Sequence, residues 1–452
     1  MSHSAVLRQR LLASTLRNAA QIRFYKDLWE NVRLSDITSV ADLPLIPTLS
    51  KSQYRSDFMF DRRSIGAAAL ITHTSGTTGD LTWRHRTSDE AAVIQHLFGL
   101  ARNETDAESL SLVVQYGRHG QAMPMPGAAN SFPIALSDDT ELDQALAALA
   151  ATFRFKGKEL RPTVLCGGGI HLTLLGQALQ ERGLKRDPPS IRCLQVLGYT
   201  DPGRYRFLME AFDNPLLVEN FSMAEIFGGA CKIWPNGHFV LDPHVIAEVL
   251  GEDGRQVRRG EVGELVLTEL FPFVQMQPLI RYRTGDLVRL LIDNTDAGFH
   301  FDWMGRREDG FLCPIPGDPL WNIAFRPLAD WLSAQPLAAR ESYISHLDIQ
   351  SCDFGSPCLK LSYNNAVGTM SIDIGLRFNP WMSRSVTNDF VGALWGFLQE
   401  ATQGSELDPM LSVTLVDARD TSSFSKTTDR PRLELAPRRL SAAVENSSTM
   451  AV

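Results

Sequence analysis

Between residues 67 and 225, short apolar runs alternate with amphipathic segments. The apolar runs are AAALITHT, SLVVQY, PTVLCGGG, IRCLQVLGY and PLLVEN. Short runs of this kind, bounded by turn residues, are typical of buried strands, and the segments between them have helical spacing. Strands that alternate with helices form a mostly parallel sheet with helices on its faces. The sequence therefore predicts an α/β fold.

The pattern changes after this region. From residue 239 to residue 292, closely spaced runs such as GELVLTEL and DLVRLLI are separated by turn sequences, which predicts an antiparallel β unit. Farther on, LDIQSCDF, CLKLSYN, TMSIDIGLRF and MLSVTLVDA are strand candidates, and the segment VTNDFVGALWGFLQEA between the last two has helical spacing. A chain of 452 residues exceeds one ordinary hydrophobic core. We expect a large N-terminal domain at 1–304 with a helical lead-in at 1–60, a small α+β C-terminal domain at 305–436, and a disordered tail at 437–452.

Charge and composition narrow the classes of function. No apolar run approaches the roughly 20 residues that span a bilayer. Arginine and glutamine interrupt the apolar patches of the N-terminus, which therefore does not resemble a secretory signal. The six cysteines are scattered without CxxC spacing, as in proteins of a reducing compartment. The net charge is −8 and no basic stripe is present. We expect a cytoplasmic protein without a membrane or nucleic-acid partner.

The segment ITHTSGTTGD follows an apolar run and is rich in glycine and hydroxyl side chains. Glycines allow several backbone N–H groups to point at one anion, and hydroxyl groups add further donors. The segment is not a Walker loop, because GxxxxGK[ST] is absent. An ordinary polar turn is the alternative interpretation. A triphosphate-binding loop is the functional one, formed by Thr74, Ser75, Gly76, Thr77, Thr78 and Gly79.

Five motifs in order identify a resemblance. They are THTSGTTG, NFSMAEIFGG, GELVLTEL, PLIRYRTGDLVRL and GRREDGF. Their order and spacing resemble those of the adenylate-forming superfamily. Two segments resemble the phenylacetate–CoA ligase branch of this superfamily: PLIRYRTGDL, and FYKDLWENVRLSDITSVADLPLIPTLSKSQYR near the N-terminus. The resemblance covers residues 22 to 312.

The resemblance implies roles for the first two motifs. The TSGTTG loop would hold the ATP phosphates. The family usually continues with Pro and Lys, but here Asp80 follows, and the basic Arg84, His85 and Arg86 either compensate or form a solvated face. Glu225 would hold Mg2+, because this hard cation prefers oxygen ligands. The residues before it would line the acyl pocket: Phe221, Ser222, Met223 and Ala224.

The last two motifs would bind the nucleoside and form a hinge. Asp286 matches the family carboxylate that accepts hydrogen bonds from both ribose hydroxyls, which suits its two oxygens. Arg306 matches the arginine that also reaches the ribose. Glu308 and Asp309 fall at the hinge between the large domain and a mobile small domain.

The family also uses a catalytic lysine near the C-terminus. Lys426 in SSFSKTTDRPRL is the candidate, because no other lysine follows Lys360. Its positive charge would stabilise the charge that develops as the carboxylate attacks the α-phosphate. A solvated tail lysine is the alternative.

The resemblance implies an ATP-dependent ligase. It would convert a carboxylic acid, aryl or otherwise hydrophobic, and MgATP into an acyl-AMP and pyrophosphate, and then transfer the acyl group to a thiol. Coenzyme A is the expected acceptor. Transfer to the phosphopantetheine thiol of a carrier protein or to an amine is an alternative, and a catalytically inactive nucleotide-binding homologue is another.

Overall fold

The computed structural model describes most of the chain. The described residues are 3–56, 68–73, 83–90, 92, 110–115, 131–136, 138–155, 157–182, 191–223, 225–226, 229–295, 298–307, 315, 317–340, 357–364, 366–418 and 432–440.

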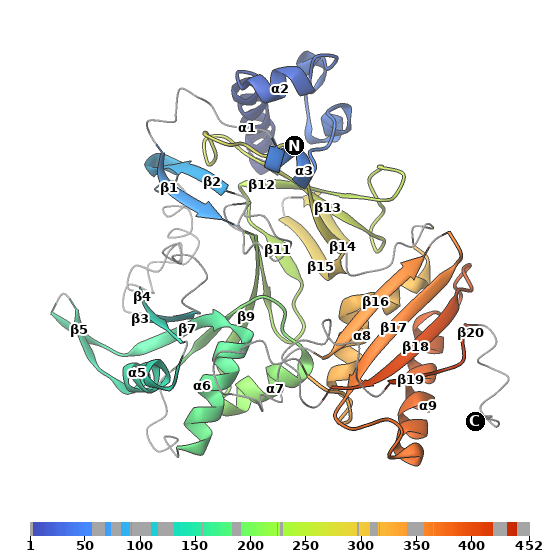
Figure 1. The fold of residues 1–452 in the computed structure, drawn as a ribbon. Helices are drawn as coiled ribbons and strands as arrows, with labels where there is room; N and C mark the ends of the chain where they lie inside the picture. Colours follow the sequence, from blue (N-terminus) through green and yellow to red (C-terminus); the bar gives the residue numbers. More distant parts are fainter. Residues whose placement is uncertain are drawn as a thin grey trace.

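An 11-stranded sheet forms the centre of the described chain (Figure 1). Its strands run in the order β12-β13-β14-β15-β11-β10-β9-β8-β7-β3-β4. Their bounds are β3 Leu110–Gln115, β4 Ser131–Ala135, β7 Pro162–Gly168, β8 Cys193–Leu197, β9 Leu216–Ser222, β10 Gly229–Ile233, β11 Phe239–Leu241, β12 Val245–Leu250, β13 Val262–Glu269, β14 Tyr282–Thr295 and β15 Gly298–Arg306.

The sheet has a parallel part and an antiparallel part. Strands β4, β3, β7, β8 and β9 pair in parallel. From β9 onward every pairing is antiparallel. The predicted α/β class and the predicted antiparallel unit are both confirmed, and the two parts share one continuous sheet.

One predicted strand lies elsewhere. The run AAALITHT forms β1 (Ala68–His73), which pairs antiparallel with β2 (Trp83–Thr87) in a separate two-stranded sheet. The expectation that it joins the parallel sheet is therefore wrong. A second two-stranded sheet consists of β5 (Phe153–Phe155) and β6 (Lys158–Leu160).

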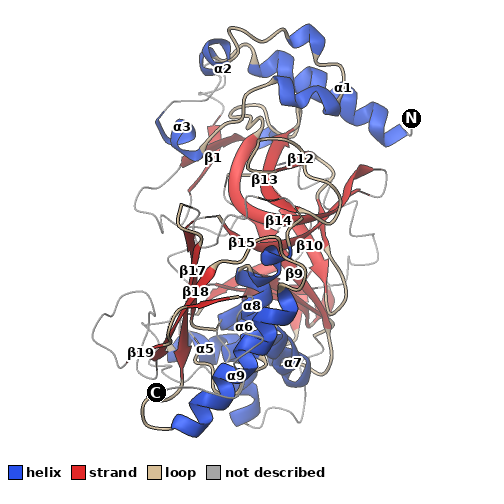
Figure 2. Ribbon diagram, turned by 90° about the vertical axis from the view of Figure 1, so that its right-hand side faces the viewer, coloured by secondary structure: helices blue, strands red, loops and turns tan. Residues whose placement is uncertain are grey.

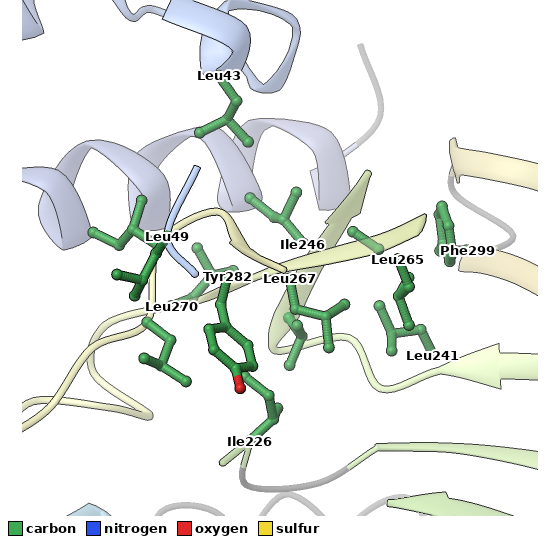
Figure 3. Packing of buried hydrophobic residues seen from close by; sticks show 14 of the residues in the cluster. Leu43, Leu49, Ile226, Leu241, Ile246, Leu265, Leu267, Leu270, Tyr282 and Phe299 are labelled. Carbon is green, nitrogen blue, oxygen red and sulfur yellow. The ribbon is translucent and has the colours of Figure 1, made fainter. Parts of the chain in front are cut away.

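Helices cover the two parts of the sheet. Next to the parallel strands lie α5 (Asp139–Ala150), α6 (Gly169–Glu181) and α7 (Pro202–Ala211), which share a leucine-rich core with them. The N-terminal segment packs on the antiparallel strands. Figure 3 shows Leu43 and Leu49 of this segment beside Ile246, Leu267 and Tyr282 of the sheet. The elements of this segment are α1 His3–Ala19, α2 Arg23–Leu28, η1 Leu34–Asp36, η2 Val40–Leu45 and α3 Lys51–Ser56.

The C-terminal part contains its own 5-stranded sheet, in the order β16-β17-β18-β19 with β20 beside β18. Its core also includes Val262, Leu287 and Met304 from the large sheet, so the two sheets are packed against a common apolar layer. Figure 2 shows helix α8 close to strands β9 and β15 of the large sheet. The bounds are η6 Pro319–Ile323, α8 Phe325–Ser333, β16 Leu359–Asn364, β17 Thr369–Leu376, α9 Arg384–Ala401, β18 Met410–Asp417, β19 Arg432–Glu434 and β20 Arg438–Arg439.

Three of the four strand candidates in this part form β16, β17 and β18, and LDIQSCDF lies outside the described residues. The domain boundaries and the disordered tail stay predictions. Within the described ranges, no helix combines the length and the apolar character that a membrane crossing needs.

Candidate active site

The predicted site residues divide into two groups. The structure describes Phe221, Ser222, Met223, Glu225, Asp286 and Arg306. The others lie outside the described residues, and their roles stay predictions: Thr74, Ser75, Gly76, Thr77, Thr78, Gly79, Ala224, Glu308, Asp309 and Lys426.

Asp286 and Arg306 lie directly opposite each other on β14 and β15. Arg306 Nη1 donates to Asp286 Oδ2 over 3.0 Å, and Trp303 Nε1 donates to Asp286 Oδ1 over 3.0 Å. The backbone N–H of Asp286 donates to Thr284 Oγ1 over 3.0 Å. Gly285 has a φ of +76°, a conformation that suits glycine and that turns the strand just before the carboxylate. The RTGD segment therefore fixes the direction of this side chain.

Burial and hydrogen bonding act on Asp286 in opposite directions. Burial raises the pKa of its carboxyl group above the ordinary value of 3.8, while Arg306 and Trp303 lower it in part. The two donors favour the ionised form, which accepts hydrogen bonds at both oxygens. Both oxygens of the Asp286 carboxylate therefore already accept one hydrogen bond each from the protein.

Glu225 is connected to the same strand as Asp286. Tyr282, at the start of β14, donates its hydroxyl to Glu225 Oε1 over 3.3 Å. Lys51 Nζ lies 3.8 Å from the same oxygen. The Glu225 side chain is 10% exposed and that of Lys51 is 33% exposed, so both can face a bound molecule. No feature of the sequence predicts a site role for Lys51.

Backbone pairing explains why Lys51 is here. Leu49 and Tyr282 form an isolated parallel bridge. The backbone N–H of Leu49 donates to Arg281 O over 2.8 Å, and that of Arg283 donates to Leu49 O over 2.9 Å. Helix α3 then begins at Lys51. A contact between distant segments therefore brings this lysine to Glu225.

Buried ion pairs hold the strand in place. Arg281 donates through Nε and Nη2 to the two carboxylate oxygens of Glu248, each over 2.9 Å. Arg283 Nε donates to Glu264 Oε2 over 3.0 Å, and Arg307 Nη1 donates to the same oxygen over 2.7 Å. Bidentate arginine–carboxylate pairs fix orientation as well as distance. The arginines of RYRTGD are thus structural, while Tyr282 of the same segment contacts Glu225 and Asp286 contacts Arg306.

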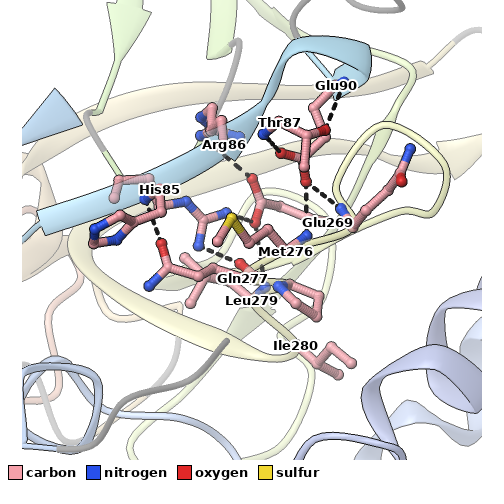
Figure 4. A network of polar contacts seen from close by, with 12 residues as sticks. His85, Arg86, Thr87, Glu90, Glu269, Met276, Gln277, Leu279 and Ile280 are labelled. Atoms are coloured by element: carbon pink, nitrogen blue, oxygen red, sulfur yellow. Dashed lines mark hydrogen bonds and ion pairs between the residues drawn. The ribbon is translucent and has the colours of Figure 1, made fainter. Parts of the chain in front are cut away.

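The basic residues after the TSGTTG segment do not form a solvated face. Arg84 and Arg86 are each 1% exposed. Arg84 donates to Glu269 and to the Gln277 carbonyl, and Arg86 Nη2 lies 3.9 Å from Glu269 Oε1 (Figure 4). The backbone N–H of His85 donates to Gln277 Oε1 over 2.5 Å. Of the two alternatives, the solvated face is wrong for Arg84 and Arg86, because their guanidinium groups are buried beside the Glu269 carboxylate on β13.

Three predicted pocket residues are described: Phe221 and Ser222 end β9, and Met223 follows it. Phe221 packs edge-on against Phe239 and Phe301, with centroid distances of 6.0 and 5.5 Å. Met223 also packs against this apolar cluster, and Ser222 is exposed. This edge of the site is therefore mainly apolar on its inner side.

The donor set fits magnesium and a nucleotide together. Among the described side chains, no group of three or more His, Cys, Asp or Glu is arranged to hold a metal. Mg2+ at nucleotide sites uses one or two carboxylates and takes its other ligands from phosphate and water. Glu225 meets this requirement as a single carboxylate, and Asp286 meets that of a ribose.

No protein-family model matches the sequence, and no curated protein matches it. Solved structures do match. A 2-hydroxyisobutyryl-CoA ligase in an open conformation, in complex with 2-HIB-AMP and CoA, has a TM-score of 0.66 and 17% identity, covering 94% of this chain and 90% of its own. The same ligase in its thioesterification state has a TM-score of 0.55 and 16% identity, covering 94% and 89%. An ATP-bound RpMatB–BxBclM chimera has a TM-score of 0.50 and 19% identity, covering 77% and 64%. The chain therefore has the fold of the adenylate-forming acyl-CoA ligases.

Proposed function

We propose that the protein is an ATP-dependent ligase that activates a carboxylic acid as its acyl-AMP and then transfers the acyl group to a thiol. The observation that carries this proposal is the layout of β14. Its first residue, Tyr282, contacts Glu225, and its Asp286 accepts hydrogen bonds from Trp303 and Arg306. One strand thus carries Asp286 and, through Tyr282, contacts Glu225, which supports a common site for the candidate ribose carboxylate and the candidate metal carboxylate.

Each group has a defined task in this proposal. Asp286 accepts hydrogen bonds from the ribose hydroxyls, and Arg306 orients Asp286 while reaching toward the sugar. Glu225 would supply the protein oxygen for Mg2+, and the bound cation would supply charge neutralisation at the phosphates. The loop at Thr74–Gly79 binds the phosphates, and Lys426 stabilises charge during acyl-AMP formation.

The finer parts of the proposal are the branch, the acid and the acceptor. Similarity of PLIRYRTGDL to the phenylacetate–CoA ligase branch supports an aryl or otherwise hydrophobic acid, and the apolar packing of Phe221 and Met223 supports it further. Coenzyme A is the proposed acceptor, and a carrier-protein thiol is the alternative outcome. The six cysteines, scattered through the sequence without CxxC spacing, support a cytoplasmic location.

A pyrophosphate-exchange assay across a panel of acids tests the proposal. Purified protein is incubated with MgATP, labelled pyrophosphate and one acid at a time, and label in ATP is counted. Acid-dependent exchange, strongest for aryl or long apolar acids, is expected. Thioester formation with coenzyme A then identifies the acceptor. Absence of exchange with every acid, in protein shown to bind ATP, would favour the inactive nucleotide-binding homologue.

The assay has a matched control. Asp143→Ala removes a carboxylate from an exposed ion pair with Arg182 in the parallel part of the molecule. This variant should exchange pyrophosphate at the parent rate, because exposed ion pairs contribute little.

A further inference from the structure

Trp303 connects the candidate ribose carboxylate to the C-terminal part of the chain. Its indole N–H donates to Asp286 Oδ1 over 3.0 Å, and Arg306 holds the other oxygen. Asp286 is 3% exposed. A carboxylate held at both oxygens in a buried position has little freedom to rotate, so its direction depends on where Trp303 lies.

Three aromatic rings meet at Trp303. Its ring centroid lies 6.0 Å from that of Tyr199 and 6.1 Å from that of Phe325. Tyr199 and Phe325 are themselves 6.1 Å apart in an edge-to-face arrangement. Tyr199 follows β8 and Phe325 begins α8, so the three rings join the parallel part of the sheet, β15 and the C-terminal part. Aromatic pairs at these distances attract each other beyond simple burial.

The end of β15 also touches α8 directly. A Cβ atom added at Gly305 would lie 2.8 Å from Phe325 Cβ, closer than side chains tolerate. The backbone two residues after Trp303 is therefore in close contact with the first residue of α8. A shift of α8 would be transmitted to Trp303 through both the rings and the backbone.

Buried polar contacts fix the position of α8. Tyr199 donates its hydroxyl to Asp330 Oδ1 over 2.6 Å. Arg326 Nη2 donates to Glu219 Oε2 over 3.2 Å, and these side chains are 7% and 2% exposed. Removing one partner of a buried ion pair leaves an uncompensated charge, so such pairs favour one geometry strongly. Helix α8 is therefore held against β9 in one defined position.

We propose that Trp303 is a positioning residue that couples the docking of α8 to the orientation of Asp286 and so sets the affinity for the ribose of ATP. The inference rests on the proposed function, in which Asp286 binds the ribose. Trp303 acts through Asp286. When α8 is seated, the three rings hold the indole N–H on Oδ1; when it is displaced, Asp286 loses an orienting donor.

Two substitutions test separately the Trp303–Asp286 hydrogen bond and the Tyr199–Asp330 contact that holds α8. Trp303→Phe keeps a ring but removes the N–H donor. Asp330→Leu removes the acceptor of the Tyr199 hydroxyl without touching Trp303. Hydrogen bonds to charged groups change equilibrium constants by roughly tenfold or more. We expect Trp303→Phe to weaken ATP binding roughly tenfold, and Asp330→Leu to weaken it by a smaller factor.

The decisive measurement is a double-mutant cycle on ATP affinity, measured by calorimetry on the full chain. If α8 acts through Trp303, Asp330→Leu weakens binding in the parent background but has little further effect in the Trp303→Phe background. The turnover number at saturating ATP should stay near the parent value in both. Additive effects of the two substitutions would overturn the coupling.

A matched control lies in the same helix. Trp331 stacks on Phe397 at 5.1 Å within the C-terminal core. Trp331→Phe should leave ATP affinity unchanged, and a tenfold loss there would overturn a specific role for Trp303. Should Trp303→Phe fail to fold, Tyr199→Phe and Phe325→Leu loosen the same rings, and unchanged ATP affinity in both would overturn the inference.

ATP binding by the parent protein distinguishes a failure of this inference from a failure of the proposed function on which it rests. A parent that binds no ATP overturns the proposed function together with the coupling. A parent that binds ATP, with a Trp303→Phe variant that binds equally well, overturns the coupling alone.

Discussion

Asp286 and Arg306 are directly opposed residues of two neighbouring strands, and their side chains meet at 3.0 Å between Oδ2 and Nη1. The register of β14 and β15 therefore builds this pair into the sheet. Because the sheet fixes both backbones, the carboxylate is oriented without needing a flexible loop.

Asp286→Ala should raise the Michaelis constant for ATP substantially. The substitution removes two charge-assisted hydrogen bonds to the ribose, each worth about 1.5 to 3 kcal/mol. Initial rates of pyrophosphate exchange at varied ATP measure the effect, with Asp143→Ala as the control. An unchanged dependence on ATP would show that Asp286 does not bind the ribose.

The pH dependence of ATP binding should report on Asp286. Burial raises the pKa of this carboxyl group, so ATP affinity should be complete above the raised pKa and should fall as the pH decreases through it. At pH values between the ordinary pKa and the raised pKa, Asp286 is protonated in the folded protein and ionised in the unfolded chain. The contribution of this group to the free energy of unfolding therefore decreases as the pH rises through that window.

Arg306→Gln provides the test, because Arg306 is the strongest influence that lowers this pKa. In the variant, the fall of ATP affinity on acidification should occur at a higher pH than in the parent. If ATP affinity falls at the same pH as in the parent but is weaker at every pH, Arg306 acts on the nucleotide and not through Asp286.

Glu225→Gln should lower turnover by weakening the magnesium site, with partial rescue at high Mg2+. The amide keeps an oxygen that can accept the Tyr282 hydroxyl, so folding should be preserved. Rates at a series of Mg2+ concentrations measure the effect. Glu225 is structural if the magnesium dependence of the variant equals that of the parent.

Glu269→Ala should destabilise the protein. The substitution removes the carboxylate that faces two buried guanidinium groups, Arg84 and Arg86. Breaking a buried ion pair by removing one partner costs about 3 to 5 kcal/mol. Urea denaturation measures the change in the free energy of unfolding. Glu159→Ala, in an exposed pair with Arg154, is the control and should change it by less than about 1 kcal/mol.

The sequence predicted strands well where their side chains are apolar. The runs at β7 and β8 could be predicted because strands inside a parallel sheet are mostly apolar along their length. It missed β2, whose sequence is WRHRT, because the carboxylate that neutralises its buried arginines lies on a distant strand. Missing β2 also led to the wrong partner for β1.

As with the strands, only part of the candidate site could be predicted from the sequence. Asp286 and Arg306 were named from motifs, and the structure brings them together. Lys51 and Trp303 were not named, because each reaches the site through contacts with segments far away in the chain. Lys51 depends on the pairing of Leu49 with Tyr282. No local pattern around either residue carries that information.

Lys426→Ala should depress acyl-AMP formation and leave thiol transfer from presynthesised acyl-AMP close to normal. In the superfamily that the sequence resembles, the small domain rotates between the two steps, so a lysine in this domain should serve only the first. The motivating observation is that Lys426 is the only lysine after Lys360 and follows strand β18. Losing a positive charge aimed at a developing oxyanion typically costs a factor of about 100 to 1,000.

The two half-reactions separate the possible outcomes for Lys426. Pyrophosphate release reports the first and thioester formation from acyl-AMP reports the second. Lys360→Ala is the matched control. Lys360 is exposed on β16, and its substitution removes the same charge from the C-terminal part. Equal loss in both half-reactions would indicate damage to the fold of the C-terminal part, and no loss in either would show that Lys426 is a solvated residue. A selective loss in the first step, absent from Lys360→Ala, is the result that a catalytic lysine requires.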